Sequence, residues 1–505
     1  MDTKALRQKI LDLAIRGKLV PQDPNDEPAS VLLERICEQK QQMVKEGKLK
    51  KKDIKNESVI FVGEDNLHYE KFADGTVKCI ENEIPFEVPT NWAWARLRNI
   101  CMMAAGKAKP ANQIKATPFE GGFPCFGGNG IRGYVDEYNQ EGTFSIIGRQ
   151  GALCGNINTA SGKFYATEHA VVTTLFSGID FNWSNYILEA MNLNKYATGA
   201  AQPGLSVANV LNVFVPVPPT QEQERIGKKI LESIKIINII KQEKLNLQTI
   251  VSNTKAKILD LAIRGKLVPQ NSTDEPASAL LERIRQEKEE LIKQGKIKRD
   301  KKESIIFKGE DNSYYAMING TPVNIADYWG FKAPNGWAWI TLKDIAVITS
   351  GKTPKSNQLS INGSIPYFKV SDMNTPGNEL YLQYSDYYIN DLYSGPVFDG
   401  GSFVFPKNGG AVLTNKKRIL ANVSVVDLNT GVFTPSNFLN KDFIFFLFSS
   451  IDFSKIYKGA IIPTVDASVI GNLIYGLPPI EEQKRIADII KTLFTQLEQI
   501  EVALS

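Results

Sequence analysis

Four polar residues that lie beside glycines have the clearest potential for chemistry in this sequence. Arg149 and Gln150 precede a glycine in one segment, and Lys407 and Asn408 precede a glycine in another. Arginine and lysine can donate hydrogen bonds to guanine, and asparagine and glutamine can pair with adenine. These segments are candidates for reading bases, and the alternative is that their amides only stabilise turns.

A second pair of polar segments follows an aromatic residue in each half of the chain. Residues 126–132 (FGGNGIR) occupy the place in the first half that residues 368–373 (FKVSDM) occupy in the second. Both follow an expected strand. Because only the first carries the full glycine pattern, the equivalence of these two loops is weaker than that of the surrounding sequence.

A glycine-lysine-threonine sequence is similar to a nucleotide-binding loop. Residues 346–353 (AVITSGKT) fit the loose pattern in which backbone N–H groups and a lysine hold phosphate. Such a loop opens directly into a helix, whereas Pro354 disfavours a helical backbone at Thr353. The corresponding residues 105–108 (AGKA) lack the threonine. We therefore expect no nucleotide to bind here.

Other enzyme signatures are missing from the sequence. The proline pairs 218–219 and 478–479 lack the flanking residues of the amino-methyltransferase motif. There is no GxSxG elbow, no HExxH helix, and only two histidines, His68 and His169, which are too few for most acid–base schemes. The sequence therefore favours a binding protein over an enzyme, with no catalytic residues.

The composition is that of a globular protein with at least two domains. The 505 residues exceed what one hydrophobic core usually supports, and no apolar run approaches the roughly 18 residues of a membrane span. Residues 1–9 lack the apolar core of a secretory signal, which predicts a cytoplasmic protein. The net charge of +4 is too small to indicate nucleic-acid binding by itself.

The cysteines are expected to be buried thiols. They form no CxxC pair and have no close histidine partners, so no zinc site or other metal site is expected. All lie in the first third of the chain: Cys37, Cys79, Cys101, Cys125 and Cys154.

The strongest feature is a tandem repeat. Residues 9–22 (KILDLAIRGKLVPQ) recur identically as residues 257–270. The match continues through DEPAS, LLERI, ESxIF, GEDN and WAW, the last at residues 92–94 and 337–339. The chain is therefore a duplication.

Two dissimilar inserts separate the repeated segments. After WAW the copies diverge, and they converge again at PPTQEQERI (218–226) and PPIEEQKRI (478–486). Short β-branched runs and turn residues in the inserts predict mixed α/β domains. The expected segments are an N-terminal helix (1–20), a helical and linker segment (21–91), the first insert (92–217), a central long helix (218–268), a second helical and linker segment (269–336), the second insert (337–477) and a C-terminal helix (478–505).

Apolar residues at spacings of three and four predict helices that pair with another helix. A helix from 221 to 266 would be roughly 69 Å long. Its first half matches residues 481–505 and its second half matches residues 2–18, so the repeat is circularly permuted and the termini are expected to lie close together. The predicted seam contains Ile226, Ile230, Ile234, Ile237, Ile240, Ile486, Ile490, Leu493, Leu497, Ile500 and Leu504.

A second helix is expected after each DEPAS segment. Asp26 and Asp274 are candidate N-caps, each two residues before a proline in the first turn. Basic runs follow at 45–55 and 293–302. These runs either contact phosphate or form solvated helix ends.

Together these motifs resemble the specificity subunits of type I restriction-modification systems. The resemblance rests on the repeated IRGKLVPQ and DEPAS-LLERI frame, the PPxxEQxxI opening, and the segments GGNGIRGY, IGRQG and SGKTP. It implies an α+β fold with two target recognition domains, joined by long helices in an antiparallel coiled coil with circularly permuted pseudo-two-fold symmetry. Each domain would read one half of a split, asymmetric site in double-stranded DNA.

The resemblance also implies partners. Two modification subunits, which methylate adenine with S-adenosylmethionine, would dock on the helices, and up to two ATP- and Mg-dependent restriction subunits would join. This chain would hold no cofactor and would not contact a membrane. The candidate DNA-binding residues are Lys107, Asn129, Arg132, Arg149 and Gln150 in the first insert, and Lys352, Lys369, Lys407, Asn408 and Lys416 in the second.

Three alternatives stay open at this point. The first is a stand-alone DNA-binding or antirestriction protein on the same scaffold. The second is a nucleotide-driven enzyme that uses the glycine-lysine-threonine loop, and the third is a purely structural coiled-coil scaffold. The target bases, the gap between half-sites, the presence of a restriction subunit and exchange of the inserts by recombination do not follow from the sequence.

Overall fold

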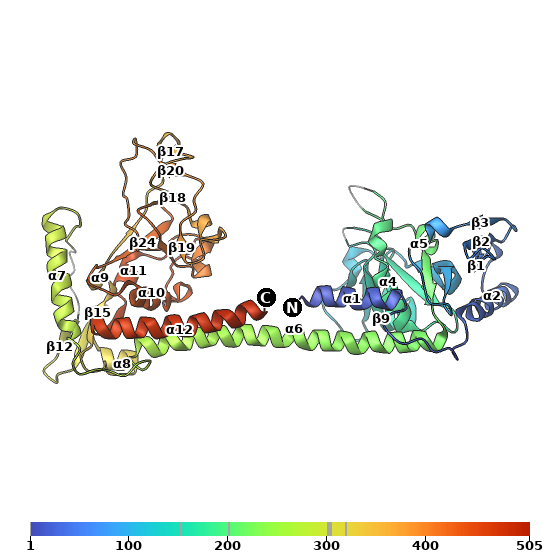
Figure 1. The fold of residues 1–505 in the computed structure, drawn as a ribbon, viewed down its shortest axis with the longest axis horizontal. Helices are drawn as coiled ribbons and strands as arrows, with labels where there is room; N and C mark the ends of the chain where they lie inside the picture. Colours follow the sequence, from blue (N-terminus) through green and yellow to red (C-terminus); the bar gives the residue numbers. More distant parts are fainter. Residues whose placement is uncertain (1, 152, 200–202, 300–305, 319–320, 505) are drawn as a thin grey trace. The chain divides into compact units, whose positions relative to one another are not determined.

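The structure is a computed structural model that describes residues 2–151, 153–199, 203–299, 306–318 and 321–504. The chain divides into two compact units, residues 1–245 (unit 1) and 246–505 (unit 2), and each contains one copy of the repeat (Figure 1). The end of the second basic run (300–302) and residues 303–305 of the second ESxIF segment lie outside the described residues.

Each unit begins with the same elements in the same order. Unit 1 starts with α1 (Thr3–Ile15), α2 (Ala29–Lys45) and a sheet of β1 (Ser58–Val62), β2 (His68–Phe72) and β3 (Val77–Cys79). Unit 2 starts with the end of α6 (Thr220–Ile263), then α7 (Ala277–Lys293) and a sheet of β12 (Ile306–Lys308), β13 (Tyr314–Ile318) and β14 (Thr321–Asn324). Asn66 and Asn312 both have a φ of 62° in the GEDN turn. The repeated sequence thus folds the same way twice.

The first insert is built on a six-stranded sheet in the order β5-β10-β8-β9-β6-β7. Helix α4 (Phe181–Ala190) and the short α5 (Val207–Leu211) follow the sheet in sequence. Trp183 and Ile187 of α4 are buried in the core of unit 1. The strands are β5 (Cys101–Ala105), β6 (Phe123–Gly127), β7 (Gly130–Val135), β8 (Gln140–Gly148), β9 (Ile157–Ala166) and β10 (Ala170–Leu175).

The second insert has a related sheet in the order β16-β24-β21-β22-β19. Helix α10 (Lys441–Ser449) buries Phe443, Phe445 and Phe448 in the core of unit 2. Strands β17 (Leu359–Ser360) and β20 (Tyr388–Ile389) pair in an arm on the side away from α12 (Ile480–Leu504) (Figure 1). The sheet strands are β16 (Ala346–Ser350), β19 (Tyr381–Leu382), β21 (Phe403–Pro406), β22 (Arg418–Leu420) and β24 (Thr430–Pro435), and β18 (Tyr367–Phe368) pairs with β23 (Val425–Val426).

The two ends of each insert are tied together by a strand pair. In unit 1, β4 (Ala93–Arg96) pairs with β11 (Phe214–Val217). In unit 2, β15 (Ala338–Thr341) pairs with β25 (Ile474–Leu477). The chain therefore enters and leaves each insert at one place, so the sequence between can diverge without changing the frame.

The long helices confirm the circular permutation. Helix α6 has 44 residues, which corresponds to about 66 Å. In unit 1, Leu11 and Ala14 of α1 share a buried cluster with Ile226 at the start of α6. In unit 2, Ala262 at the end of α6 shares one with Ile486 of α12. The end of α6 thus repeats the environment of α1, and α12 repeats that of the start of α6; the closeness of the termini remains a prediction.

The start of each pairing helix is joined to its insert by a buried carboxylate. Glu222 Oε2 accepts a hydrogen bond from Trp92 Nε1 at 3.0 Å, and its Oε1 accepts one from Gln22 at 2.7 Å. Glu482 does the same with Trp337 and Gln270, at 3.0 and 3.1 Å. Burial raises the pKa of both carboxyl groups. This contact, which we call the carboxylate joint, links the two repeated motifs to one another.

The predicted N-cap role of Asp26 and Asp274 is wrong. Helices α2 and α7 begin after Pro28 and Pro276, and neither has a side-chain cap. Asp26 instead forms an ion pair with Arg225, and Asp274 pairs with Arg485 at 2.6 Å. The aspartates are drawn away from the helix ends because the arginines of the PPxxEQxRI motif lie beside them.

The predicted helix seam is buried at its start and more open at its end. Ile226, Ile230 and Ile237 are buried, and Ile234 packs on the same core cluster. In α12, Ile486 and Ile490 are buried, and Leu493 and Leu497 are partly buried. Ile240 and Leu504 are half-buried, whereas Ile500 is exposed. The first turns of each seam therefore pack against the insert as well as against a helix.

The expectation that all five cysteines are buried is wrong for two of them. Cys101, Cys125 and Cys154 are buried, but Cys79 is exposed and Cys37 is half-buried. Cys79 ends β3, where the small sheet turns one face to solvent. Burial raises the pKa of Cys101 to about 12, so its thiol stays protonated.

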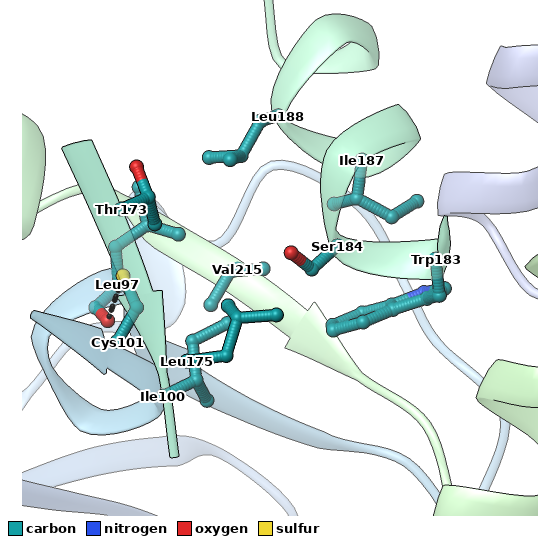
Figure 2. A pocket seen from close by; sticks show the side chains of 10 residues that line it. All are labelled: Leu97, Ile100, Cys101, Thr173, Leu175, Trp183, Ser184, Ile187, Leu188 and Val215. Atoms are coloured by element: carbon teal, nitrogen blue, oxygen red, sulfur yellow. Dashed lines mark hydrogen bonds between the residues drawn. The ribbon is translucent and has the colours of Figure 1, made fainter. Parts of the chain in front are cut away.

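The interior of unit 1 contains a small apolar cavity between α4 and the sheet. Figure 2 shows its lining, which includes Trp183 and Ile187 of α4, Leu175 of β10 and Val215 of β11. Its volume is about 10 Å³, enough for at most about one water molecule. This cavity is a packing feature and not a ligand site.

The ion pair between Asp26 and Arg225 can be tested through stability. The Asp26 side chain is 7% exposed, so Arg225→Ala leaves a buried carboxylate without its partner. We expect unit 1 to lose roughly 1 to 3 kcal/mol, measured by thermal or urea unfolding. Arg35→Ala is the matched control because its pair with Glu27 is about half exposed, and it should cost less than about 1 kcal/mol. Equal losses for the two variants would contradict the structural role of the buried pair.

Candidate nucleic-acid interface

Four loops of the first insert meet at one end of its sheet. The N–H of Lys107 donates to the carbonyl of Ala166 at 3.0 Å, and that of Thr167 donates to Phe126 at 3.0 Å. The N–H of Arg149 donates to the carbonyl of His169 at 2.9 Å. These bonds join residues 106–109, 126–130, 148–151 and 166–170, which we call loop cluster 1.

The second insert forms the same arrangement. The N–H of Lys352 donates to Val426 at 3.0 Å, that of Asp427 to Phe368 at 3.0 Å, and that of Lys407 to Asn429 at 2.7 Å. These bonds join residues 351–354, 368–372, 406–409 and 426–430, which we call loop cluster 2. The clusters correspond bond for bond although their side chains differ.

A fifth segment supports the predicted match between IGRQG and FPKNG. The carbonyl of Arg149 accepts from Leu205 at 2.8 Å, and that of Lys407 accepts from Val465 at 2.9 Å. In both clusters the N–H of the glycine two residues further on, Gly151 or Gly409, donates to a proline carbonyl at 2.9 Å. The basic and amide residues of the two inserts are therefore held by the same backbone bonds.

The predicted residues of loop cluster 1 lie at its surface. Lys107, Asn129, Arg132 and Gln150 are exposed, and Arg149 is half-buried. Asn129 Oδ1 accepts a hydrogen bond from Asn156 Nδ2 at 2.9 Å. This bond fixes the plane of the Asn129 amide and therefore the direction of its Nδ2 group. Arg132 lies on β7, just outside the cluster as defined. Together with Arg132 the cluster presents two guanidinium groups, one ammonium and two amides, a set that can bind phosphates and base edges.

The predicted residues of loop cluster 2 are more tightly held. Lys407 Nζ donates to Ser350 at 3.1 Å, and Asn408 Nδ2 donates to Asn429 at 3.3 Å. Lys369 Nζ lies 4.7 Å from the centre of the Tyr387 ring. Lys352 is exposed. Lys416 lies outside the four segments of the cluster, where its Nζ donates to Asn374.

Lys417, the neighbour of Lys416, shows why the sequence alone does not tell which lysine of this loop is available to bind DNA. Lys417 turns inward, where its Nζ donates to the carbonyl of Ile451 at 2.7 Å. Burial lowers the pKa of Lys417 to about 7. Only Lys416 of this pair remains available at the surface.

The weak match between residues 126–132 and 368–373 reflects a real difference. In the first insert, β6 and β7 form a hairpin, and Arg132 projects from β7. In the second, residues 370–374 form a short 3₁₀ helix. The two segments share equivalent backbone bonds at Phe126 and Phe368 and form different elements after them, so the second insert has no hairpin that places residues as Asn129 and Arg132 are placed.

The glycine-lysine-threonine loop does not have the geometry of a phosphate site. The N–H groups of Gly351 and Lys352 donate to the carbonyls of Thr430 and Val426, each at 3.0 Å. No α-helix follows: the next element is a 3₁₀ helix of three residues, Ser356–Gln358. The groups that would hold phosphate are already used to build loop cluster 2.

The sequence prediction missed one loop in each cluster. Residues 167–169 bring Glu168 and His169 into loop cluster 1, with 3.2 Å between Glu168 Oε1 and His169 Nε2. The corresponding loop of the second insert contains Asp427, which accepts from Thr430. Burial raises the pKa of Asp427, and burial together with Asp427 raises the pKa of Tyr367 to about 12. The available signal was a short polar segment between two apolar runs.

The described part of the chain contains no group of three or more Cys, His, Asp or Glu side chains with the geometry to hold a metal ion. None of its helices is long and apolar enough to cross a membrane.

The packing of loop cluster 2 predicts the effect of adding one methyl group. A Cβ atom on Gly351 would lie 2.1 Å from the carbonyl oxygen of Val426, whereas one on Gly410 would meet no atom within 4 Å. We expect Gly351→Ala to destabilise unit 2 by roughly 1 to 3 kcal/mol and Gly410→Ala to have little effect in thermal unfolding. The same stability in both variants would show that this loop is not held as described.

Comparison with known proteins places the chain in a family. The family model for the type I restriction modification DNA specificity domain matches residues 89–249 and 334–503, more than half of the chain. Among curated proteins, the chain is 45% identical over 151 residues to the type I restriction enzyme EcoprrI specificity subunit of Escherichia coli, covering 29% of this chain and 36% of the relative. It is 29% identical over 418 residues to the EcoAI specificity subunit of Escherichia coli, covering 70% of this chain and 64% of the relative.

The chain therefore spans less than two thirds of the length of these curated relatives. Among solved structures, a chain from work on complex assembly and conformational transition of the type I R-M system matches with a TM-score of 0.53 at 14% identity, covering 83% of this chain and 94% of that chain. At this identity the likeness shows the fold alone. With a repeated frame, two α/β inserts and a match in both halves, the chain belongs to the family of type I restriction-modification DNA specificity subunits.

Proposed function

We propose that this chain provides the sequence specificity of a type I restriction-modification complex. Each loop cluster reads one half of a bipartite site in double-stranded DNA, and the chain itself catalyses no reaction. The single observation that carries this proposal is the pair of loop clusters, whose backbones correspond while their side chains differ. Two different readers in one chain require a target whose halves differ.

The candidate residues divide the work within each cluster. We propose that Arg149 and Gln150 in cluster 1, and Lys407 and Asn408 in cluster 2, contact base edges because an adjacent pair of basic and amide donors matches guanine beside adenine. Lys107 and Lys352, at equivalent exposed positions, suit phosphate contacts. Asn129, Arg132, Lys369 and Lys416 complete the two surfaces.

The repeated frame implies a partner in two copies. The frame sequence occurs in both units, and a frame that is repeated offers the same surface twice, which suits two copies of one subunit. We propose that these are modification subunits that methylate adenine with S-adenosylmethionine, joined by up to two ATP- and Mg-dependent restriction subunits. The cofactors belong to those partners, and the complex works in the cytoplasm on chromosomal or entering DNA.

The remaining alternatives are less well supported. A stand-alone or antirestriction DNA-binding protein would not need two equivalent joints. A nucleotide-driven enzyme conflicts with the use of the Gly351 and Lys352 N–H groups in loop cluster 2. A purely structural scaffold would not need exposed hydrogen-bond donors at the end of the sheet in each insert.

Methylome sequencing of a host that expresses this chain with its modification subunit tests the proposal. We expect one new bipartite, asymmetric adenine-methylation motif. Arg149→Ala should relax or remove one base of the first half-site, and Lys407→Ala should affect only the second, each at a cost of roughly 1 to 3 kcal/mol in binding. Gly410→Ala is the control and should leave the motif unchanged. A motif unaffected by either variant would reject the residue assignment, and no methylation with a bound partner would reject the function.

A further inference from the structure

A hairpin tip beside loop cluster 2 carries two exposed isoleucines. Ile461 is 95% exposed and Ile462 is 61% exposed. Single apolar side chains at a surface are common, but two adjacent ones at the tip of a tightly held turn are not explained by packing. The tip, residues 459–463, follows the 3₁₀ helix at Phe453–Lys455.

The backbone of this tip is fixed. Lys458 and Thr464 exchange two backbone hydrogen bonds of 2.8 Å, which close the hairpin. Gly459 has a φ of 89°, and a Cβ atom there would lie 2.5 Å from the carbonyl oxygen of Ile462. Pro463 restricts Ile462 to an extended backbone. The two isoleucines are therefore presented rigidly rather than on a loose loop.

The tip is attached to the loop that carries Lys407 and Asn408. The carbonyl of Pro463 accepts from Gly409 at 2.9 Å, and Thr464 forms a β-bridge with Asn408. Lys458 is exposed at the base of the hairpin. Because the tip is bonded to the loop that carries Asn408, a ligand bound at Asn408 lies close to the tip, and the ammonium of Lys458 favours a polyanion over an apolar protein surface.

We propose that Ile461 and Ile462 form an apolar wedge that enters a base step of the second half-site and unstacks it. Inserted apolar side chains open base steps in DNA-binding proteins, and flexible pyrimidine–purine steps cost least to open. The wedge deepens the proposed function and rests on it. It adds specificity through the deformability of a step rather than through hydrogen bonds.

The first insert carries a different sequence at the corresponding place, where residues 200–202 lie outside the described part of the chain. Its hairpin is closed by the equivalent pair Thr198 and Gly204, with two bonds of 2.9 Å, and Pro203 accepts from Gly151. In the sequence, the positions of the two isoleucines are occupied by Ala201 and Gln202. An alanine is too short to enter a base step, so only the second half-site is distorted.

The test uses the full chain bound to its modification subunit and a duplex that carries the motif found by methylome sequencing. 2-Aminopurine is placed in turn at the purines of each half-site, because its fluorescence rises when it unstacks. Ile461→Ala with Ile462→Gln converts the tip to the residues of the first insert. Ile361→Ala is the control: Ile361 is 75% exposed in the same unit but lies outside loop cluster 2. Thermal unfolding checks that all variants fold.

We expect 2-aminopurine fluorescence to rise in the second half-site only. In the double variant this rise should be lost, and the affinity for the duplex should fall about tenfold, which corresponds to roughly 1.4 kcal/mol. Ile361→Ala should retain both. Unchanged fluorescence in the double variant, with intact preference for the motif, overturns the wedge alone. If the complex that contains the original chain shows no preference for the motif duplex, the proposed function is overturned and the wedge with it.

Discussion

The buried carboxylate at the start of each pairing helix is the contact on which the rest of the structure depends. Glu222 and Glu482 receive hydrogen bonds from a tryptophan that opens the insert and a glutamine that follows the repeated helix. One side chain thus joins three segments that are distant in sequence. It also explains the PPxxEQxRI motif. The glutamate forms the joint, and the next glutamine accepts a hydrogen bond from the backbone N–H of the residue that caps the insert helix, Asp180 or Asn440. The arginine neutralises a buried aspartate.

The carboxylate joint belongs to the part of the structure that is the same in both halves, whereas the side chains of the loops differ between them. The paired strands at the base of each insert, and the backbone bonds within each loop cluster, keep the same geometry in both halves. The side chains at the loop tips are not used in that framework, so they can change without loss of the fold. We propose that a guanidinium in one cluster and an ammonium in the other, or two isoleucines in place of alanine and glutamine, alter recognition and leave the frame intact.

The sequence predicted most of this arrangement because the repeat is nearly exact in the frame. The long helices and the circular permutation follow from matching motifs, and the match of Arg149 with Lys407 was visible beside a shared glycine. The capping role of Asp26 was mispredicted because its partner, Arg225, lies about two hundred residues away. The loops at Glu168 and Asp427, and the inward turn of Lys417, depend on contacts between strands and on burial that no local pattern reports.

The most direct test of the account is to replace residues 92–217 with a second copy of residues 337–477 and sequence the methylome of a host that expresses this chain with its modification subunit. If each insert reads its half-site independently and the frame sets only the spacing, the new motif will contain the second half-site twice, in inverted orientation, around the gap. Retention of the original first half-site, despite a folded protein bound to its partner, would contradict the claim that recognition lies in the loop clusters.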